Sequence, residues 1–377
     1  MVVGVDLFYS EMPSIATVRA HAAAATENAG IRIDNDAIVR VVERISKDQY
    51  EKTRLQHGMA VPLRFSSPEE HLNFVCVMAL LNACSGYRSA FHESTGKGAA
   101  DNMRRLALGL FLTPHVGADG PPPLSAAGLK ALGPGQFAEI LGVSLHTEAP
   151  HPTLPGVIVG TVGGPLHEAL DALASMCRET GEFLVSRGHG DLGSYVKDAI
   201  TAASASDDAI GTLLSALAHV PGFADAAAVD GQEVYIFKKA LLLIHTLISS
   251  AERIQLPALS ELAHKACDAS LLSTLPLFVD NVIPTLLIHW GVIQGVPQAA
   301  LSDSREISTN DGYRIRAAAL TAGAQIVQRA RGLAAAHTEW SFLASATESE
   351  LDAYIWSVAK EPELRSIRRI AEKSVMY

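Results

Sequence analysis

The spacing of apolar residues along the chain predicts a protein built almost entirely of helices. Within residues 36–47, four aliphatic side chains recur at the spacing of one helical face. Thr347 and Glu350 form the pattern of a capping box at the start of another helix. Expected helices of the second half cover residues 167–186, 194–203, 209–218, 234–254, 259–269, 282–293, 313–330 and 348–359. We therefore expect an all-α, globular fold that is not a simple bundle.

The first half of the chain is less regular. Expected helices there cover residues 16–28, 36–47, 68–84, 99–111, 125–132 and 135–141. The helix at 68–84 is apolar nearly all round, which is typical of a core helix. Residues 113–163 are rich in proline and glycine, and 157–159 is the best candidate there for a short strand. No repeat or clear linker divides the chain, so we expect one domain over 1–377, with 1–14 as a candidate peripheral arm.

One carboxylate interrupts the apolar run at residues 275–290. Asp280 lies there between Pro276 and Pro284, and burying an ionised carboxylate is costly unless something compensates for it. Asp280 or Asn281 can cap the helix that follows, where free N–H groups favour a negative charge. A carboxylate in such a place can also be catalytic. The residues alone leave these two roles open.

Composition and charge restrict the partners of the protein. The chain has 377 residues, of which 48% are hydrophobic and 19% charged, as in a folded globular protein. Its formal net charge is −10, which argues against a nucleic-acid polymer as partner, because such polymers are usually met by a basic face. A small phosphorylated ligand needs only a few local cations and stays open.

The four cysteines and the apolar segments indicate a compartment. Cys76, Cys84, Cys177 and Cys267 lie in apolar helical stretches without CxxC spacing, so we expect reduced core residues and no metal site. The first residues lack the basic start of a signal peptide. The longest apolar runs are too short or too interrupted to span a bilayer. We expect an intracellular, cytoplasmic protein with no membrane partner.

General motifs of nucleotide and metal sites fail in their context. Residues 188–193 match GxGxxG, but a helix precedes them where a dinucleotide site needs a strand. Gly98 follows Gly96-Lys97, where a phosphate-binding P-loop has Ser or Thr. His92-Glu93 lacks the second histidine of a zinc-protease helix. These motifs therefore assign no function.

A series of short motifs, each weak alone, occurs in one order along the chain. The series reads Leu72-Asn73-Phe74, Ser85-Gly86-Tyr87, Glu179-Thr180-Gly181, Phe237-Lys238-Lys239-Ala240, Phe278-Val279-Asp280, Arg316-Ala317-Ala318, Tyr354-Ile355-Trp356 and a final Tyr377. In order and spacing the chain resembles the queuosine salvage protein family, most closely its fungal-type members. The resemblance covers about residues 15–377.

The resemblance implies an enzyme and a fold. It implies a queuosine 5′-phosphate N-glycosylase/hydrolase, which releases the 7-deazaguanine base queuine from the nucleotide for reuse in tRNA modification. The fold that it implies is all-α and related to helical DNA glycosylases. It implies a small nucleotide, queuosine 5′-monophosphate, as substrate and no cofactor. The residues give no expectation for the oligomeric state.

The resemblance also implies the residues of the site. Asp280 matches the carboxylate that acts as nucleophile or stabilises the transition state. The expected ligand contacts are His57, Phe278, Asn281, Asp352, Trp356 and, for the 5′-phosphate, Lys238. Asp352 and Trp356 are four residues apart on one expected helix, so they share a face. One can accept hydrogen bonds from a guanine-like edge while the other stacks on the base.

Other interpretations of these residues remain open. Without the resemblance, Asp352 is a solvated acid near a helix start, Trp356 a core anchor, His57 a loop residue and Lys238 a solvated helix end. Ser357 stands where many family members have an aspartate next to the tryptophan. The alternatives to an enzyme are a non-catalytic queuine- or nucleotide-binding pseudoenzyme and a helical interaction protein.

Overall fold

The computed structural model describes residues 9, 12–54, 63–113, 120–268, 270–302 and 304–377. The chain divides into two compact units, and each is described by itself. Unit 1 consists of Met1–Pro68, Lys197–His219 and Phe223–Glu372, and unit 2 of Glu69–Val196, Val220–Gly222 and Lys373–Tyr377. The single domain expected over 1–377 stays a prediction, and most of the expected arm at 1–14 lies outside the described residues.

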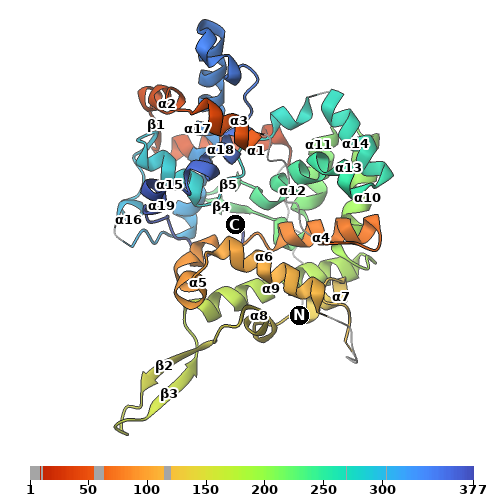
Figure 1. Cartoon of the computed structure of the whole chain (residues 1–377), viewed down its shortest axis with the longest axis vertical. Coiled ribbons are helices and arrows are strands. Elements are labelled where there is room, and N and C mark those ends of the chain that lie inside the picture. The colour runs from red at the N-terminus through yellow and green to blue at the C-terminus, as the bar shows by residue number, and fades with distance from the viewer. Residues whose placement is uncertain (1–8, 10–11, 55–62, 114–119, 269, 303) are drawn as a thin grey trace. The chain divides into compact units, whose positions relative to one another are not determined.

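Both units are mainly helical, which confirms the expected fold class; the likeness to helical DNA glycosylases stays a prediction. The strands of the described part form three antiparallel pairs (Figure 1). They are β1 (Arg32–Ile33) with β6 (Ile293–Gln294), β2 (His146–Pro150) with β3 (Ile158–Val162), and β4 (Ala226–Val229) with β5 (Gln232–Tyr235). The strand expected at 157–159 is therefore confirmed as part of β3.

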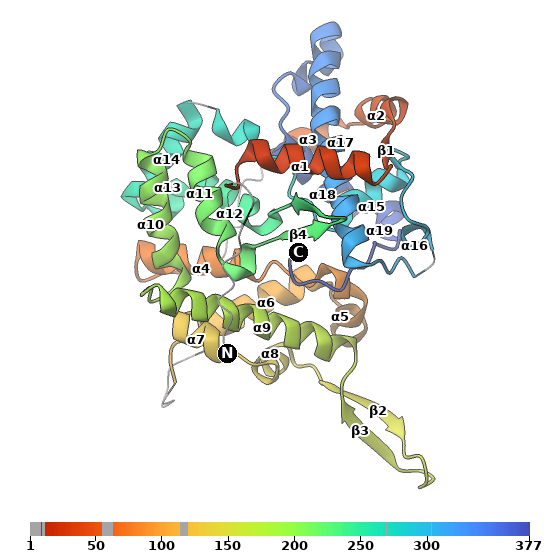
Figure 2. The same ribbon diagram turned by 180° about the vertical axis from the view of Figure 1, so that it is seen from behind.

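Unit 1 is built around one long helix, α17 (Thr309–Ala336), whose first residue follows the capping side chain of Ser308. The other helices of this unit are α1 (Ile15–Asn28), α2 (Asn35–Val42), α3 (Lys47–Arg54), the last part of α10 (Leu192–Ala205), α11 (Ala209–Ala218), α12 (Lys238–Ser249), α13 (Ala251–Ile254), α14 (Pro257–Asp268), α15 (Val282–His289), α16 (Gln298–Leu301), α18 (Glu348–Val358) and α19 (Pro362–Arg365). Helix α1 packs on α17 and on the β4–β5 hairpin (Figure 2).

Small residues on α17 bring it close to the segment that carries Asp280. A Cβ atom on Gly323 would lie only 2.4 Å from Cδ1 of Leu277 and 3.3 Å from Oε2 of Glu348. A side chain at 323 would thus displace the buried Leu277. Helices α15 and α18 both contact α17 (Figure 1). These three helices form the frame of the candidate site.

The helix expected at 234–254 is wrong at its beginning. Residues Gln232–Tyr235 form β5, and the turn before them has positive φ at Asp230 (53°) and Gly231 (79°). An Asp-Gly pair is a strong signal for a tight hairpin turn, and it outweighs the helical spacing of the apolar residues that follow. The helix begins only at Lys238, after Phe237 in the left-handed region (φ 48°).

Unit 2 packs its helices around an apolar core. Its helices are α4 (Pro68–Leu80), α5 (Arg88–Thr95), α6 (Ala99–Leu112), α7 (Ala126–Ala131), α8 (Pro134–Leu141), α9 (Pro165–Ser186) and the first part of α10 (Leu192–Ala205). Asn73 of the Leu-Asn-Phe motif is a structural residue here, because its side chain donates to the carbonyl of Leu124 and accepts from the N–H of Gly193. Strands β2 and β3 are exposed along their whole length.

The burial of the cysteines and the length of the apolar helices can be compared with the expectations from the sequence. Cys76, Cys84 and Cys177 are buried thiols, as expected for core residues, whereas Cys267 is exposed, so its assignment to the core is wrong. In the described ranges, every helix taken singly is too short or too polar to cross a bilayer. Only together do α4 and the helical segment Ser85–Thr95 have the length and apolarity of a membrane span, and they are bent by 55° relative to each other.

Candidate functional site

Asp280 lies at the entrance to α15 and is fully buried, with 0% of its surface exposed. Its Oδ1 accepts a hydrogen bond of 2.7 Å from the N–H of Val282, the first residue of the helix. Its Oδ2 has no hydrogen-bond partner among the described residues. Asp280, and not the side chain of Asn281, therefore makes the capping bond. One carboxylate oxygen thus accepts from the first N–H of the helix, and the other is buried without a hydrogen-bond partner among the described residues.

The acids of α18 hold the segment that precedes Asp280. Oε2 of Glu348 accepts from the N–H of Leu277 (3.2 Å), and Oδ2 of Asp352 accepts from the N–H of Phe278 (2.9 Å). Two acids four residues apart on one helical face thus bind two consecutive amides. Asp352 is 7% exposed, so its interpretation as a solvated acid is wrong. This arrangement fixes the backbone two residues before Asp280.

Asn281 is turned toward the end of the chain. Its Nδ2 donates to the carbonyl of Ile370 at 2.9 Å, and its own carbonyl accepts from the hydroxyl of Thr285 at 2.5 Å. The same hydroxyl accepts from the N–H of Ile370 at 3.1 Å. Asn281 therefore ties residues near 370 to the start of α15, and its contact with a ligand stays a prediction.

Among the cations that act on Asp280, Lys238 has the largest effect. It is the first residue of α12 and is 3% exposed, so its interpretation as a solvated helix end is wrong. Burial lowers the pKa of its ammonium group, while the nearby carboxylates of Asp280, Asp352 and Asp225 raise it. A lysine among three carboxyl groups is first of all the counter-ion of those that are ionised. The 5′-phosphate contact expected for Lys238 stays a prediction.

Burial raises the pKa of both Asp280 and Asp352. For Asp280, the charge of Lys238 acts against burial most strongly, followed by the N–H of Val282 and the charges of Arg369 and Arg316. For Asp352, burial raises the pKa to about 8; the N–H of Phe278 lowers it and the charge of Asp280 raises it. Asp352 is therefore mostly protonated at neutral pH. The two carboxyls disfavour charge on each other, as interacting acids do.

Aromatic residues border the two acids. Phe278 is buried, and the centroid of its ring lies 5.5 Å from that of His245. Trp356 is half-buried and shares a face of α18 with Asp352. Ser357 accepts a hydrogen bond of 3.1 Å from Nε2 of Gln49. The structure thus gathers Asp280, Asp352, Lys238 and Phe278, whereas His57 lies outside the described residues.

A buried ion pair beneath Lys238 was missed from the sequence. Arg316 donates two hydrogen bonds to the carboxylate of Asp225, at 2.8 and 3.0 Å, and both side chains are at most 2% exposed. The guanidinium of Arg316 also lies 4.6 Å from the ring centroid of Tyr313. A charged residue inside the apolar face of a helix is the signal that could have found Arg316. Its partner lies 91 residues away along the chain, and no local pattern identifies it.

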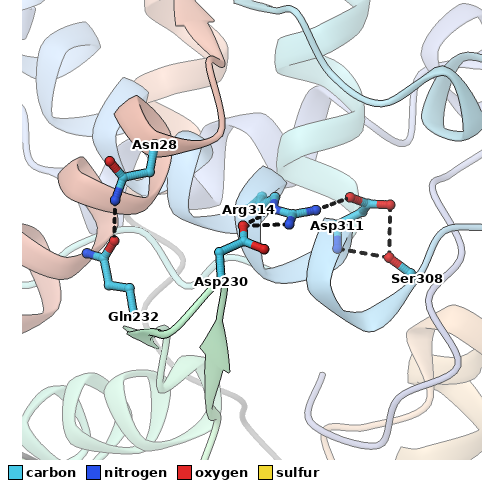
Figure 3. A network of polar contacts seen from close by, with 6 residues as sticks. All are labelled: Asn28, Asp230, Gln232, Ser308, Asp311 and Arg314. Atoms are coloured by element: carbon cyan, nitrogen blue, oxygen red, sulfur yellow. Dashed lines mark hydrogen bonds and ion pairs between the residues drawn. The ribbon is translucent and has the colours of Figure 1, made fainter.

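A second polar cluster lies at the surface of unit 1 (Figure 3). Arg314 binds Asp230 at 2.6 Å and Asp311 at 2.7 Å, and Asn28 donates to Gln232 at 2.6 Å. The cluster borders a hollow of about 380 Å³. Since Arg314 binds two carboxylates, we interpret it as a structural residue that connects the β4–β5 turn to the start of α17. No group of three residues suited to hold a metal ion occurs in the described part of the chain.

Comparison with known proteins identifies the family of the chain. A family model described as queuosine salvage protein matches residues 165–377, more than half of the chain. A curated relative from Sphaerobacter thermophilus, named queuosine 5′-phosphate N-glycosylase/hydrolase, is 26% identical over 266 residues, which are 70% of this chain and 69% of the relative. The family match includes Asp280, Asp352, Lys238 and the Asp225–Arg316 pair. The chain belongs to the queuosine salvage protein family.

Proposed function

We propose that this protein hydrolyses the N-glycosidic bond of queuosine 5′-monophosphate, with Asp280 as the catalytic carboxylate. The products are queuine and ribose 5-phosphate. The bond between C1′ of the ribose and the base nitrogen breaks, and its electron pair leaves with the base. The hydroxyl of water is added to C1′, and the remaining proton of that water ends on the base. The name of the relative from Sphaerobacter supports this reaction.

The observation that carries the proposal is the state of Asp280. One of its oxygens is fixed by the N–H of Val282 and the other has no described partner, in a fully buried place beside Lys238. Breaking the bond builds positive charge on the ribose, and a fixed anion next to it stabilises the transition state more than the ground state. A 7-deaza base lacks the ring nitrogen that other purines offer for protonation. The demand on the carboxylate is therefore high.

Asp352 and Trp356 are suited to hold the base. A protonated carboxyl donates one hydrogen bond and still accepts others, which matches a base edge that has both donors and acceptors. The indole of Trp356 lies on the same helical face and offers a stacking surface. Phe278 adds an apolar wall through its buried ring. In this arrangement the base lies near α18 and the ribose near Asp280.

The proposal is tested with purified protein and queuosine 5′-monophosphate. We expect free queuine and ribose 5-phosphate in equal amounts, measured by liquid chromatography with mass spectrometry. The nucleoside queuosine, offered in parallel, tests how far the 5′-phosphate contributes. A wild-type protein that binds the nucleotide and leaves it intact over long incubation would refute the proposal.

One observation favours a second candidate function, a binding protein without turnover. By the resemblance, Ser357 stands where many family members have an aspartate beside the tryptophan, and its hydroxyl already accepts a hydrogen bond from Gln49. If this replacement has removed catalysis, queuine should raise the melting temperature of the protein although no product forms. Ser357→Asp should then restore queuine release. Product formation by the wild type excludes this alternative.

A further inference from the structure

The Asp225–Arg316 pair lies directly behind the start of α12, in the same unit as the candidate site. Asp225 is 0% and Arg316 2% exposed, so neither has access to bulk solvent. The pair is bidentate, with two parallel hydrogen bonds of 2.8 and 3.0 Å. This geometry fixes the plane of the carboxylate as well as its position.

Asp225 controls the backbone from which Lys238 projects. Its carbonyl accepts hydrogen bonds from the N–H groups of Ile236 (3.0 Å) and Phe237 (3.1 Å). Its Oδ2 lies 3.4 Å from the backbone nitrogen of Lys238, which donates to it. One residue thus receives three consecutive N–H groups of the chain. Phe237 adopts a left-handed conformation (φ 48°), which a bulky side chain adopts only where its surroundings force it.

The strained turn determines the direction of the lysine side chain. Because Phe237 turns the chain sharply, α12 begins at Lys238 and its first side chain is directed to the interior. The charged groups that act on this ammonium come from four elements. They are Asp280 before α15, Asp352 on α18, Asp225 before β4 and Arg316 on α17. Asp280 itself lies in the field of three cations, Lys238, Arg369 and Arg316, of which Lys238 has the largest effect.

We propose that Asp225, fixed by Arg316, is a positioning residue that directs Lys238 at Asp280 and so keeps the catalytic carboxylate charged. The inference rests on the proposed function of Asp280. Asp225 itself touches no reacting atom in this account. Its effect passes through the backbone of Phe237 and Lys238.

The Asp230–Arg314 pair provides a matched control. It joins the turn of the same β4–β5 hairpin to the same helix, α17, at 2.6 Å, but the side chain of Asp230 is 60% exposed. Asp225→Asn and Asp230→Asn are the same chemical change on two arginine-bound carboxylates. A general effect of losing an arginine-bound carboxylate at this hairpin would appear in both variants. An effect confined to Asp225→Asn comes from positioning or from the burial of its pair, and the pH profile separates these two causes.

The experiment is a double-mutant cycle on queuine release with Asp225→Asn, Lys238→Met and the double variant, each with a full pH profile. We expect Asp225→Asn to lower kcat about 10-fold or more, and the double variant to match Lys238→Met within about 2-fold, because the first residue acts through the second. The acidic limb of the profile should move to higher pH in all three variants, because Lys238 is either absent or no longer directed at Asp280. A carboxyl without a nearby cation has a higher pKa. Asp230→Asn should behave as wild type.

Three results would overturn the inference. If the fold-loss of kcat in the double variant equals the product of the losses in the two single variants, Asp225 acts independently of Lys238. A limb that moves to lower pH in Asp225→Asn would show only the field of an unpaired Arg316. An unmoved limb with reduced kcat would show a structural role, because loss of folded enzyme changes the amplitude and not the pH dependence. If Asp225→Asn does not fold, Arg316→Lys is measured in its place, with the same expected shift.

The failure of the inference is distinguishable from that of the proposed function. Absence of queuine release by both the wild type and Asp230→Asn refutes the function and the inference together. Wild-type kinetics and an unchanged pH profile in Asp225→Asn refute only the positioning role.

Discussion

The buried carboxyl of Asp352 makes the stability of unit 1 depend on pH. Its pKa is about 8 in the folded protein, against an ordinary value of 3.8. The folded state therefore binds a proton more tightly than the unfolded state does. This contribution to stability is complete below about pH 4 and is lost as the pH rises toward 8. Each unit of pKa difference corresponds to about 1.4 kcal/mol, so the upper limit over the whole range is roughly 6 kcal/mol.

Asp352→Asn isolates this effect. An asparagine keeps the shape of the side chain and an oxygen that accepts from the N–H of Phe278, but it has no proton to lose. The stability of the variant relative to wild type should rise with pH, by up to about 1.4 kcal/mol per unit between about pH 4 and 8, and level off above. Burial also raises the pKa of Asp280 and Glu348. Both residues are present in the two proteins, so only the part of the Asp280 contribution that depends on Asp352 remains in the comparison.

The measurement is urea unfolding of both proteins at several pH values. Tryptophan fluorescence is a suitable signal, because the three tryptophans of the chain, Trp290, Trp340 and Trp356, all belong to unit 1. Circular dichroism serves as the second probe of the transition. A stability difference that is constant between about pH 5 and 8, or that falls with rising pH, would refute the reasoning.

Two further predictions concern the frame and the charge of the site. Gly323→Ala should destabilise the protein by about 1–3 kcal/mol, because the new methyl group meets the side chain of Leu277 at 2.4 Å. Gly332 on the same helix is the control, because a Cβ atom there would have nothing within 4 Å, and Gly332→Ala should stabilise the protein slightly. Thermal unfolding measures both variants, and equal changes in their melting temperatures would contradict this account. Lys238→Met should lower kcat for queuosine and for its 5′-phosphate alike, measured by queuine release. A loss confined to the KM of the phosphorylated substrate would instead assign Lys238 to the phosphate.

Much of the fold could be predicted because its signals are local. The capping box at Thr347 and Glu350 is present, and the helix at Ala209–Ala218 has the bounds expected from its apolar spacing. The mistaken start of the helix at 234–254 has a local cause as well, because the Asp-Gly pair before it favours a hairpin turn more strongly than the apolar spacing favours a helix. Strand β2 was missed because all of its residues are exposed and show no apolar alternation.

The candidate site was only partly predictable. An acid inside an apolar run led to Asp280, and the structure shows that it caps α15 in the way the residues allowed. The two buried acids of α18 could not be recognised from local pattern, because acids near a helix start are usually solvated. Asp225 and Arg316 meet only through the tertiary fold. Pairing over such a distance is decided by packing, which a single sequence does not display.

The most direct test of the central claim is queuine release from queuosine 5′-monophosphate by Asp280→Asn. The amide keeps the size of the side chain and an oxygen that accepts from the N–H of Val282, so α15 keeps its cap. Without the negative charge, kcat should fall at least about 100-fold, as when a fixed charge is removed from a transition state. Asp230→Asn, the same change at an exposed position, should retain full activity. Release of queuine by Asp280→Asn at the wild-type rate would contradict the account.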